Sequence, residues 1–294
     1  MRGKGKGLYR EELKYRLFYI ISYEAVIIIS DLFKIFEENR VVNWHEHVWF
    51  DKEQNLDRGL LGKLVDVAKK THTDLLVCSN PVLPNHCPPE LFRRCNDVQA
   101  EAMALYPDFI KGMCFVNPGY IDEALDEIDR CVGTMGFIGV KLYNQYLISD
   151  PILYKLIRKC AELDVPILEH ACKLNFYQES QPFASTGTHF AKVAAAHPDV
   201  TFIHAHISGG GDWQWALKEI APFPNVFIDM SGSVCDENII EESVRYLGAD
   251  RILFGTDMSY SACVGKIIAA DIYYEDKVKI LNNPHFARYL ERGA

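Results

Sequence analysis

From about residue 41 onward, the chain alternates between short apolar runs and longer amphipathic stretches. The short runs are rich in β-branched and aromatic residues and are typical of buried strands, whereas the longer stretches repeat about every 3.6 residues and are typical of helices. Parallel strands need helical crossovers of this kind, and a series of eight such units predicts an α/β fold, the closed (β/α)8 TIM barrel. The expected strands are Val41–Val48, Asp74–Ser79, Ile110–Asn117, Gly136–Leu142, Val165–His170, Val200–His206, Asn225–Ser231 and Arg251–Asp257.

Helices are expected between these strands, and a final helical region is expected from about Gly265. Pro151 suits the first turn of one helix, with Asp150 as its N-cap. An open doubly wound sheet is the alternative, but it would more often carry a glycine-rich phosphate turn after its first strand, whereas this first strand ends in histidines. The expected helices are Leu60–Lys70, Glu90–Tyr106, Tyr120–Cys131, Pro151–Leu163, Thr188–His197, Trp213–Ile220 and Asn238–Tyr246.

Residues 1–40 are expected to form a helical extension, and residues 41–294 the catalytic barrel. Basic residues precede an apolar run over residues 17–33, which in outline resembles a signal peptide. Glu24 interrupts this run, and Asp31 and Lys34 close it before it reaches the roughly 20 apolar residues of a membrane span. We therefore expect a helix that covers the barrel or a partner subunit, and a homodimer would provide such a cover.

Charge and cysteine content restrict the partners and the compartment. The formal net charge of −9 argues against a nucleic-acid partner. The nine cysteines are scattered and include no Cys-x-x-Cys pair, which fits reduced thiols in a cytoplasmic protein better than a disulfide framework or a structural zinc site. The expected partner is a small-molecule substrate, with neither nucleic acid nor membrane involved.

Histidines gather at the C-terminal ends of the expected strands, where barrels of this kind carry their catalytic groups. His45 and His47 are two residues apart on the first strand, so their side chains should leave the same face. If that face is the barrel interior, both imidazoles can reach one metal ion. Glu46, between them, should face away from that ion.

Three further candidates, His170, His206 and Asp257, end the fifth, sixth and eighth strands. A carboxylate at the tip of an apolar strand is costly unless it is paired or metal-bound, so Asp257 is a candidate metal ligand, catalytic base, or both. His206 is a candidate ligand or proton-transfer residue, and His204 should share its face one pleat deeper, as a core residue. Histidines with a carboxylate suit zinc, and also manganese or iron, and a metal-bound water would then be the nucleophile.

Several short motifs along the barrel region are specific when they are taken together. They are His45-Glu46-His47, Tyr106-Pro107-Asp108 leading into Phe115-Val116-Asn117-Pro118, Gly136-Phe137-Ile138-Gly139-Val140-Lys141-Leu142, Pro166-Ile167-Leu168-Glu169-His170, His206-Ile207-Ser208-Gly209-Gly210-Gly211-Asp212-Trp213 and Phe254-Gly255-Thr256-Asp257. With these motifs the chain resembles the amidohydrolase superfamily, and within it the amidohydrolase-2 group of aminocarboxymuconate-semialdehyde decarboxylase and related decarboxylases and hydrolases.

The resemblance implies a distorted β/α barrel with one divalent metal ion, zinc first, and an acid/base close to its bound water. Three positions depart from the pattern or extend it. Asn43 stands where the family usually has an acid, and Glu169 places an acid directly before a ligand histidine. Lys141 is either a substrate-carboxylate anchor or structural cation, or a carboxylated lysine bridging two metals, as in dihydroorotase-like relatives. The implied ligands are His45, His47, His170 and Asp257, with His206 as the acid/base and Asp257 as a second catalytic candidate.

Three functions remain open at this point. The favoured one is a hydrolase that opens an amide, lactone or ester bond, because hydrolysis is the commonest outcome in the superfamily. The alternatives are a non-oxidative decarboxylase acting on a carboxylated ring or unsaturated acid, and an inactive barrel that serves as a binding protein. The residues expected to face the substrate are Tyr143, Trp49 and Asn175, with Asn144, Tyr146 and Arg58 as further candidates.

Overall fold

A computed structural model of the protein describes residues 33–82, 87–171, 181–207, 213–232 and 236–292. The chain divides into two compact units, Met1–Glu38 and Asn39–Ala294. In the first unit residues 33–38 are helical, and the rest of the expected N-terminal extension lies outside the described residues. Among the described residues, no helix combines the length and the apolar character needed to cross a membrane.

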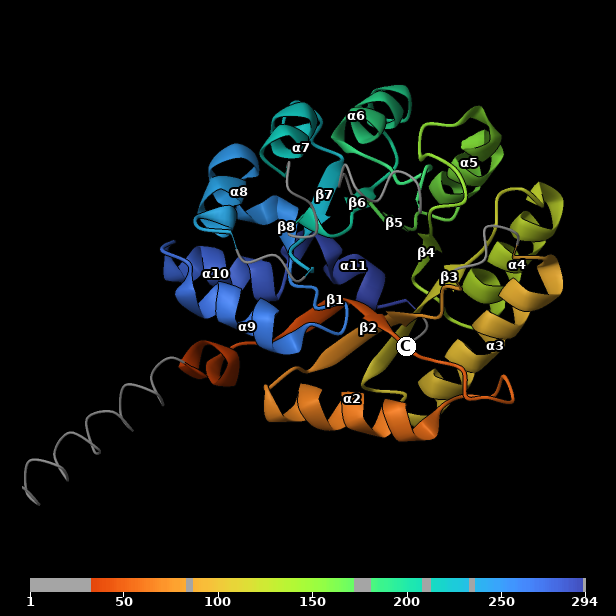
Figure 1. Ribbon diagram of the computed structural model, residues 1–294, viewed down its shortest axis with the longest axis horizontal. Helices are drawn as coiled ribbons and strands as arrows, with labels where there is room; N and C mark the ends of the chain where they lie inside the picture. Colours follow the sequence, from red (N-terminus) through yellow and green to blue (C-terminus); the bar gives the residue numbers. More distant parts are fainter. Residues whose placement is uncertain (1–32, 83–86, 172–180, 208–212, 233–235, 293–294) are drawn as a thin grey trace, which may run out of the picture. The chain divides into compact units, whose positions relative to one another are not determined.

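The second unit contains eight parallel strands that follow one another in sequence order, with helices around them (Figure 1). Hydrogen bonds also join the last strand to the first, since Trp44 N donates to Phe254 O at 2.8 Å. The expected (β/α)8 barrel is therefore confirmed. The strands are β1 (Val42–His47), β2 (Leu75–Ser79), β3 (Ile110–Phe115), β4 (Gly139–Leu142), β5 (Ile167–Glu169), β6 (Phe202–His204), β7 (Val226–Asp229) and β8 (Ile252–Leu253).

Each helix expected between the strands is present, and the C-terminal region folds into three more. The stretch that begins at Pro151 opens with a 3-10 turn, η1 (Pro151–Leu153), and Asp150 caps it by accepting from Ile152 N at 3.0 Å. The helices are α2 (Arg58–Lys70), α3 (Pro89–Leu105), α4 (Ile121–Thr134), α5 (Tyr154–Glu162), α6 (Gly187–Ala196), α7 (Trp213–Ile220), α8 (Ile239–Leu247), α9 (Tyr260–Ala269), α10 (Tyr274–Leu281) and α11 (Ala287–Leu290).

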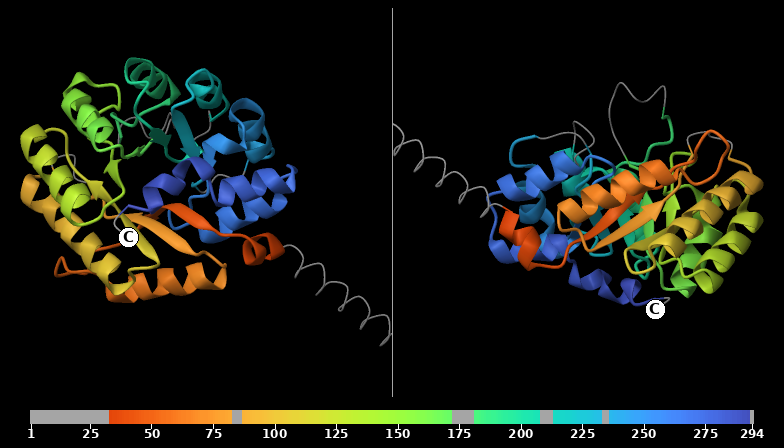
Figure 2. Two further views of the ribbon diagram at one scale, coloured as in Figure 1. Left: turned by 180° about the vertical axis from the view of Figure 1, so that it is seen from behind. Right: turned by 90° about the horizontal axis from the view of Figure 1, so that it is seen from below.

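Apolar side chains from the strands fill the barrel interior, and the segment that contains α11 closes one end of it. Figure 2 shows α11 lying across this end in its right-hand view. Val42 and Trp44 of β1 belong to the core, and the ring of Trp44 meets that of Phe286 edge-on at 4.7 Å. The closed end leaves the opposite end, at the strand tips, as the place for a site.

Strand β1 contains one residue more than its ladder with β2 requires. Between Asn43 and Glu46, three steps along β1 correspond to two steps along β2. Such a β-bulge changes which side chains face inward. Regular alternation would put Trp44 and His45 on opposite faces, yet Trp44 lies in the core and His45 points into the mouth of the barrel. The same-face argument for the two histidines therefore needed this bulge to bring them to the interior.

Candidate metal centre

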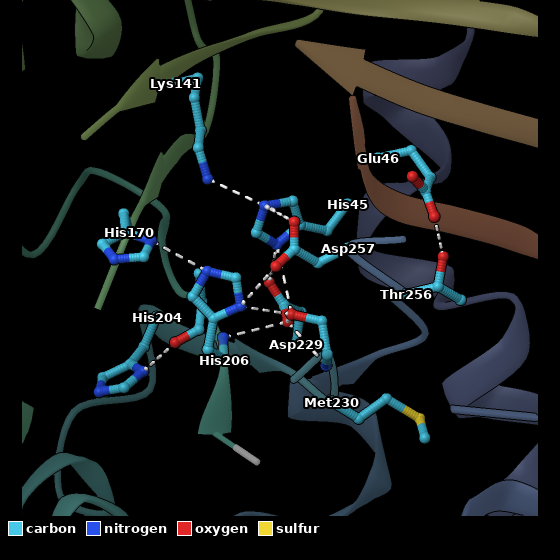
Figure 3. A network of polar contacts seen from close by, with 12 residues as sticks. His45, Glu46, Lys141, His170, His204, His206, Asp229, Met230, Thr256 and Asp257 are labelled. Carbon is cyan, nitrogen blue, oxygen red and sulfur yellow. Dashed lines mark hydrogen bonds and ion pairs between the residues drawn. The ribbon is translucent and has the colours of Figure 1, made fainter. Parts of the chain in front are cut away.

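His45, His47 and Asp257 form a compact group where the tip of β1 meets the segment after β8. Each offers one ligand atom, and these atoms all lie within 4.8 Å of one another. Nε2 of His47 is 2.9 Å from Oδ1 of Asp257, and Nε2 of His45 is 3.9 Å from the same oxygen. Figure 3 shows Asp257 turned toward His45. Two imidazoles and a carboxylate are a donor set that suits a divalent transition-metal ion.

The far nitrogens of both β1 histidines are held by acceptors. Nδ1 of His45 lies 2.8 Å from Oδ2 of Asp229, and Nδ1 of His47 lies 3.2 Å from the carbonyl oxygen of Ser79. A proton on each Nδ1 satisfies these contacts and leaves a lone pair on each Nε2. The Nε2 of His47 faces Asp257, and that of His45 lies between Asp257 and Lys141. Metal-binding histidines are oriented in this way by carboxylate and carbonyl acceptors, so the residues present fit a metal ion.

Burial favours the neutral form of His45, His170 and His206, which is the form that metal ligands require. Burial, reinforced by the charge of Lys141, lowers the pKa of His45 and lowers that of His170 to about 4. Burial also brings the pKa of His206 well below its ordinary value. For Asp257 burial acts in the opposite direction, but the neighbouring histidines outweigh it and hold the pKa of this carboxyl below its usual range. At neutral pH these four residues therefore offer imidazole lone pairs and a carboxylate.

Asp229 is a site residue that was not predicted from the sequence. It ends β7, is fully buried, and contacts both His45 and the backbone N–H of His206, the latter at 3.2 Å. Although burial alone would raise its pKa, His45 and His206 hold the pKa of Asp229 low. The signal was present in Val-Phe-Ile-Asp, an acid at the tip of an apolar strand, which is the same pattern that identified Asp257.

His206 and His170 lie side by side next to this group. Nδ1 of His170 is 3.0 Å from Nε2 of His206, whose Nδ1 is 3.4 Å from Oδ2 of Asp257. The structure places ligand atoms of His206, His45 and Asp229 together in a second possible group, and His170 belongs to neither group. The other face of His170 stacks on Tyr143, with ring centroids 4.4 Å apart. The role of His170 as a ligand stays a prediction.

The expectation that His204 shares the face of His206 is wrong. His204 ends β6 and points outward, where its ring meets that of Phe190 at 4.6 Å (Figure 3). The backbone then leaves the strand, because His206 adopts a left-handed conformation with φ of +58°. This turn redirects the His206 side chain toward Asp257, so simple alternation no longer relates the two histidines.

Lys141 brings a buried cation to the same place. It lies on β4, is fully buried, and its Nζ is 3.0 Å from Nε2 of His45 (Figure 3). Burial lowers the pKa of Lys141 from 10.5 to about 8, although Asp257 and Asp229 favour the charged form. An ammonium group at this position is suited to bind an anionic group of a small molecule.

The lowered pKa of Lys141 predicts a pH-dependent stability. Below pH 8 the lysine is charged in both states, and the folded state carries the full cost of burying it; between pH 8 and 10.5 the unfolded chain binds more protons, so this cost disappears as the pH rises. Metal-free Lys141→Met should therefore be more stable than the metal-free wild type below pH 8, and this advantage should shrink toward pH 10.5. Urea unfolding across this pH range measures it, and parallel stability curves would contradict it.

The remaining expected site residues fall in different places. The ring of Trp49 lies 5.8 Å from that of His47, and both residues line a cavity of about 380 Å³ between β1, α2 and the start of α9. Asn144 is buried, whereas Arg58 is exposed and pairs with Glu101 at 2.6 Å. Asn175 lies outside the described residues. The seven described cysteines are unpaired.

Comparison with known proteins agrees with the resemblance that the sequence motifs indicate. The family model described as "Amidohydrolase" matches residues 84–281, about two thirds of the chain. A gamma-resorcylate decarboxylase of Rhodococcus jostii (strain RHA1) is 26% identical over 243 residues, which span 65% of this chain and 74% of that protein. A 2-keto-4-carboxy-3-hexenedioate hydratase of Sphingobium sp. is 25% identical over 196 residues, spanning 56% of this chain and 57% of the hydratase.

Solved structures show the same fold at lower identity. A 5-carboxyvanillate decarboxylase from Novosphingobium aromaticivorans, crystallised with bound manganese and 3-methoxy-4-hydroxy-5-nitrobenzoic acid, superimposes with a TM-score of 0.69. It is 16% identical, and the match covers 86% of this chain and 97% of that one. At this identity the likeness concerns the barrel architecture.

Proposed function

The chain belongs to the amidohydrolase family, and from this premise we propose that it is a metal-dependent lyase that removes CO2 from a small carboxylated ring or unsaturated acid. On the sequence alone, hydrolysis was the favoured reaction. The relatives instead include a decarboxylase and a hydratase, which support the alternative reading better. Both reactions act on carbon skeletons that carry carboxylates.

The structural observation that carries this proposal is the buried ammonium of Lys141 beside the His45–His47–Asp257 group. A hydrolase acting on a neutral amide or ester has no need for a second cation at that point. A decarboxylase must hold a carboxylate, and Lys141 offers a charge-assisted hydrogen bond to it. The cost of burying this lysine is then compensated when the anionic substrate binds.

We propose that the site holds one divalent ion, zinc or manganese, on His45, His47 and Asp257, with His170 as an additional ligand. Two proteins of similar fold were crystallised with bound manganese, and the imidazoles and the carboxylate of this chain suit either metal. When bound, such an ion supplies a Lewis acid that stabilises negative charge on substrate oxygens.

In this reaction the protein must deliver one proton to the substrate. When the bond to CO2 breaks, its electron pair stays on the substrate carbon, and that carbon must gain one proton. Asp257 and His206 are the proposed acid/base pair, because Oδ2 of Asp257 is 3.4 Å from Nδ1 of His206; the pair takes one proton from water and passes it to the substrate carbon. Asp257 is 29% exposed, whereas His206 is 8% exposed, so the carboxyl is the member of the pair that can reach a substrate. Lys141 holds the carboxylate until it leaves.

Metal removal tests this function directly. Protein stripped with a chelator should release CO2 from carboxylated phenols at less than about one hundredth of the rate of protein reloaded with one equivalent of Zn²⁺ or Mn²⁺. The rate of CO2 release would be measured with a panel of carboxylated rings and unsaturated diacids. Lactones and aryl esters serve as the parallel panel. Metal-dependent hydrolysis of that panel without CO2 release, or full activity after stripping, would contradict the proposal.

A further inference from the structure

A second polar cluster, which takes no part in the proton transfer above, lies between β1 and the segment after β8. It consists of Asn43, Glu46, Thr256 and Tyr260, and we call it the clasp. Asn43, Glu46 and Thr256 are fully buried. Figure 3 shows Glu46 and Thr256 on the side of Asp257 away from His170 and His206. A buried carboxyl group is costly, so its position here needs an explanation.

Glu46 collects hydrogen bonds from both sides of Asp257. Its Oε1 accepts from the hydroxyl of Thr256 and, at 3.1 Å, from the backbone N–H of Met258. Its Oε2 accepts from the backbone N–H of His47 at 3.3 Å. The residues immediately before and after Asp257 are therefore attached to one carboxyl group, which also contacts the backbone of a proposed ligand histidine.

Asn43 completes the same arrangement from the other direction. Its Nδ2 donates to Thr256 Oγ1 at 2.7 Å and to Tyr260 OH at 3.1 Å, and it lies 3.4 Å from Oε1 of Glu46. Its Oδ1 accepts from the backbone N–H groups of His45 and Thr256, each at 3.2 Å. A carboxamide is the group required here, because it both donates and accepts, and a carboxylate would face Glu46 with the same charge.

The segment that the clasp holds is unfavourable by itself. Asp257 and Met258 are successive non-glycine residues in the left-handed region, with φ of +43° and +64°. A side chain crowds its own backbone in this region, so such residues persist only where the surroundings impose the conformation. The conformation turns the Asp257 carboxyl toward His47, at 2.9 Å. Without the bonds to Thr256 and Met258, this segment would relax and the carboxyl would leave the histidines.

We propose that Asn43 and Glu46 are positioning residues that hold the Asp257 carboxyl in its metal-binding orientation, and thereby set the affinity of the site for its ion. The inference rests on the proposed metal function. It assigns to Glu46, the residue between the two histidines, a role that does not involve contact with the ion. The pair works as one carboxylate and one carboxamide, so the two positions depend on each other.

Exchange of the two functional groups gives the test. Glu46→Gln and Asn43→Asp should each weaken Mn²⁺ or Zn²⁺ binding about 10- to 100-fold, the effect usual for groups that orient metal ligands. In Asn43→Asp two carboxylates face each other. The double variant N43D/E46Q restores one carboxylate and one carboxamide, and it should bind metal more tightly than Asn43→Asp alone. Thr256→Val removes the central hydroxyl without altering the charge, and it should also weaken metal binding. It provides the test if one of the charge variants fails to fold.

Chelator-competition titration of the folded proteins measures metal affinity, and thermal unfolding of the metal-free proteins measures stability separately. Glu127→Gln is the matched control: Glu127 is a carboxyl group 2% exposed whose hydrogen-bond partners include Asn96 and Arg130, away from β1 and β8. This control should lower the unfolding temperature and leave metal affinity unchanged. A clasp that only stabilised the fold would behave in the same way as this control.

The outcomes separate the two proposals. Weaker binding in the single variants, with partial recovery in the double variant, supports the clasp. Wild-type affinity within twofold in Glu46→Gln and Thr256→Val, or a double variant whose losses simply add, overturns it. If the wild-type protein itself binds neither metal, the proposed metal function fails and the clasp inference fails with it.

Discussion

Replacing Asp257 with asparagine is expected to lower the rate of CO2 release about 1,000-fold, because the substitution removes the group proposed to transfer the proton and weakens the metal site at the same step. The carboxamide would keep the size of the Asp257 side chain, and the backbone bonds of this residue would stay, including that from its N–H to His45 O at 2.7 Å. Steady-state rates at saturating metal and substrate measure the effect.

The matched control for this prediction is Asp250→Asn. Asp250 lies close to β8, is 48% exposed, and pairs with Lys279 at 3.7 Å, so its loss should alter the rate less than twofold. A variant at Asp257 that keeps more than a tenth of the wild-type rate in excess metal would show that another group carries the proton. In that case His206, its neighbour, would be the first residue to replace.

Replacing His47 with alanine is expected to abolish stoichiometric metal binding. Groups that merely orient metal ligands change affinity 10- to 100-fold, so loss of a direct ligand should cost at least about 100-fold. The imidazole of His47 is the closest of the site histidines to Asp257, at 2.9 Å, which makes it the contact that the remaining residues can least replace.

Metal content after dialysis, measured by plasma emission spectrometry, tests this second prediction. We expect about one ion per chain for the wild type and less than about a tenth of that for His47→Ala. His285→Ala is the control, because His285 is exposed and precedes α11 at the closed end of the barrel. An unchanged metal content in His47→Ala, with wild-type stability, would remove the central support for the metal site.

The fold could be predicted from the sequence because each strand is a buried apolar run bounded by an amphipathic helix. That pattern does not depend on knowing which face of a strand points inward. The site depends on orientation, and there the sequence was less informative. The bulge in β1 and the left-handed turn at His206 both redirect side chains, and neither leaves a mark in the order of apolar and polar residues.

The reaction was harder to predict than the candidate metal ligands. His45, His47 and Asp257 were recognisable because histidines and acids at strand tips are unusual, and the structure places these three together. Asp229 escaped notice because it stood inside the expected strand Asn225–Ser231 and not at its end. The choice between hydrolysis and decarboxylation depends on the residues around the ligands, which vary within one fold. Only the buried position of Lys141 gave that choice a physical basis.

The extra residue in β1 gives this strand two independent halves. In the first half, Val42 and Trp44 pack in the core; in the second, His45 and His47 point into the mouth of the barrel. Loss of Trp44 or His45, the two residues inside the bulge, would leave a regular ladder in which Glu46 and His47 still pair with Cys78 and Ser79. The strand would keep its register and would lose either a core side chain or one of the two histidines. A gap of one residue at this point in a related sequence, with the core tryptophan kept, would therefore mark a barrel that folds in the same way and lacks the first histidine of the proposed site.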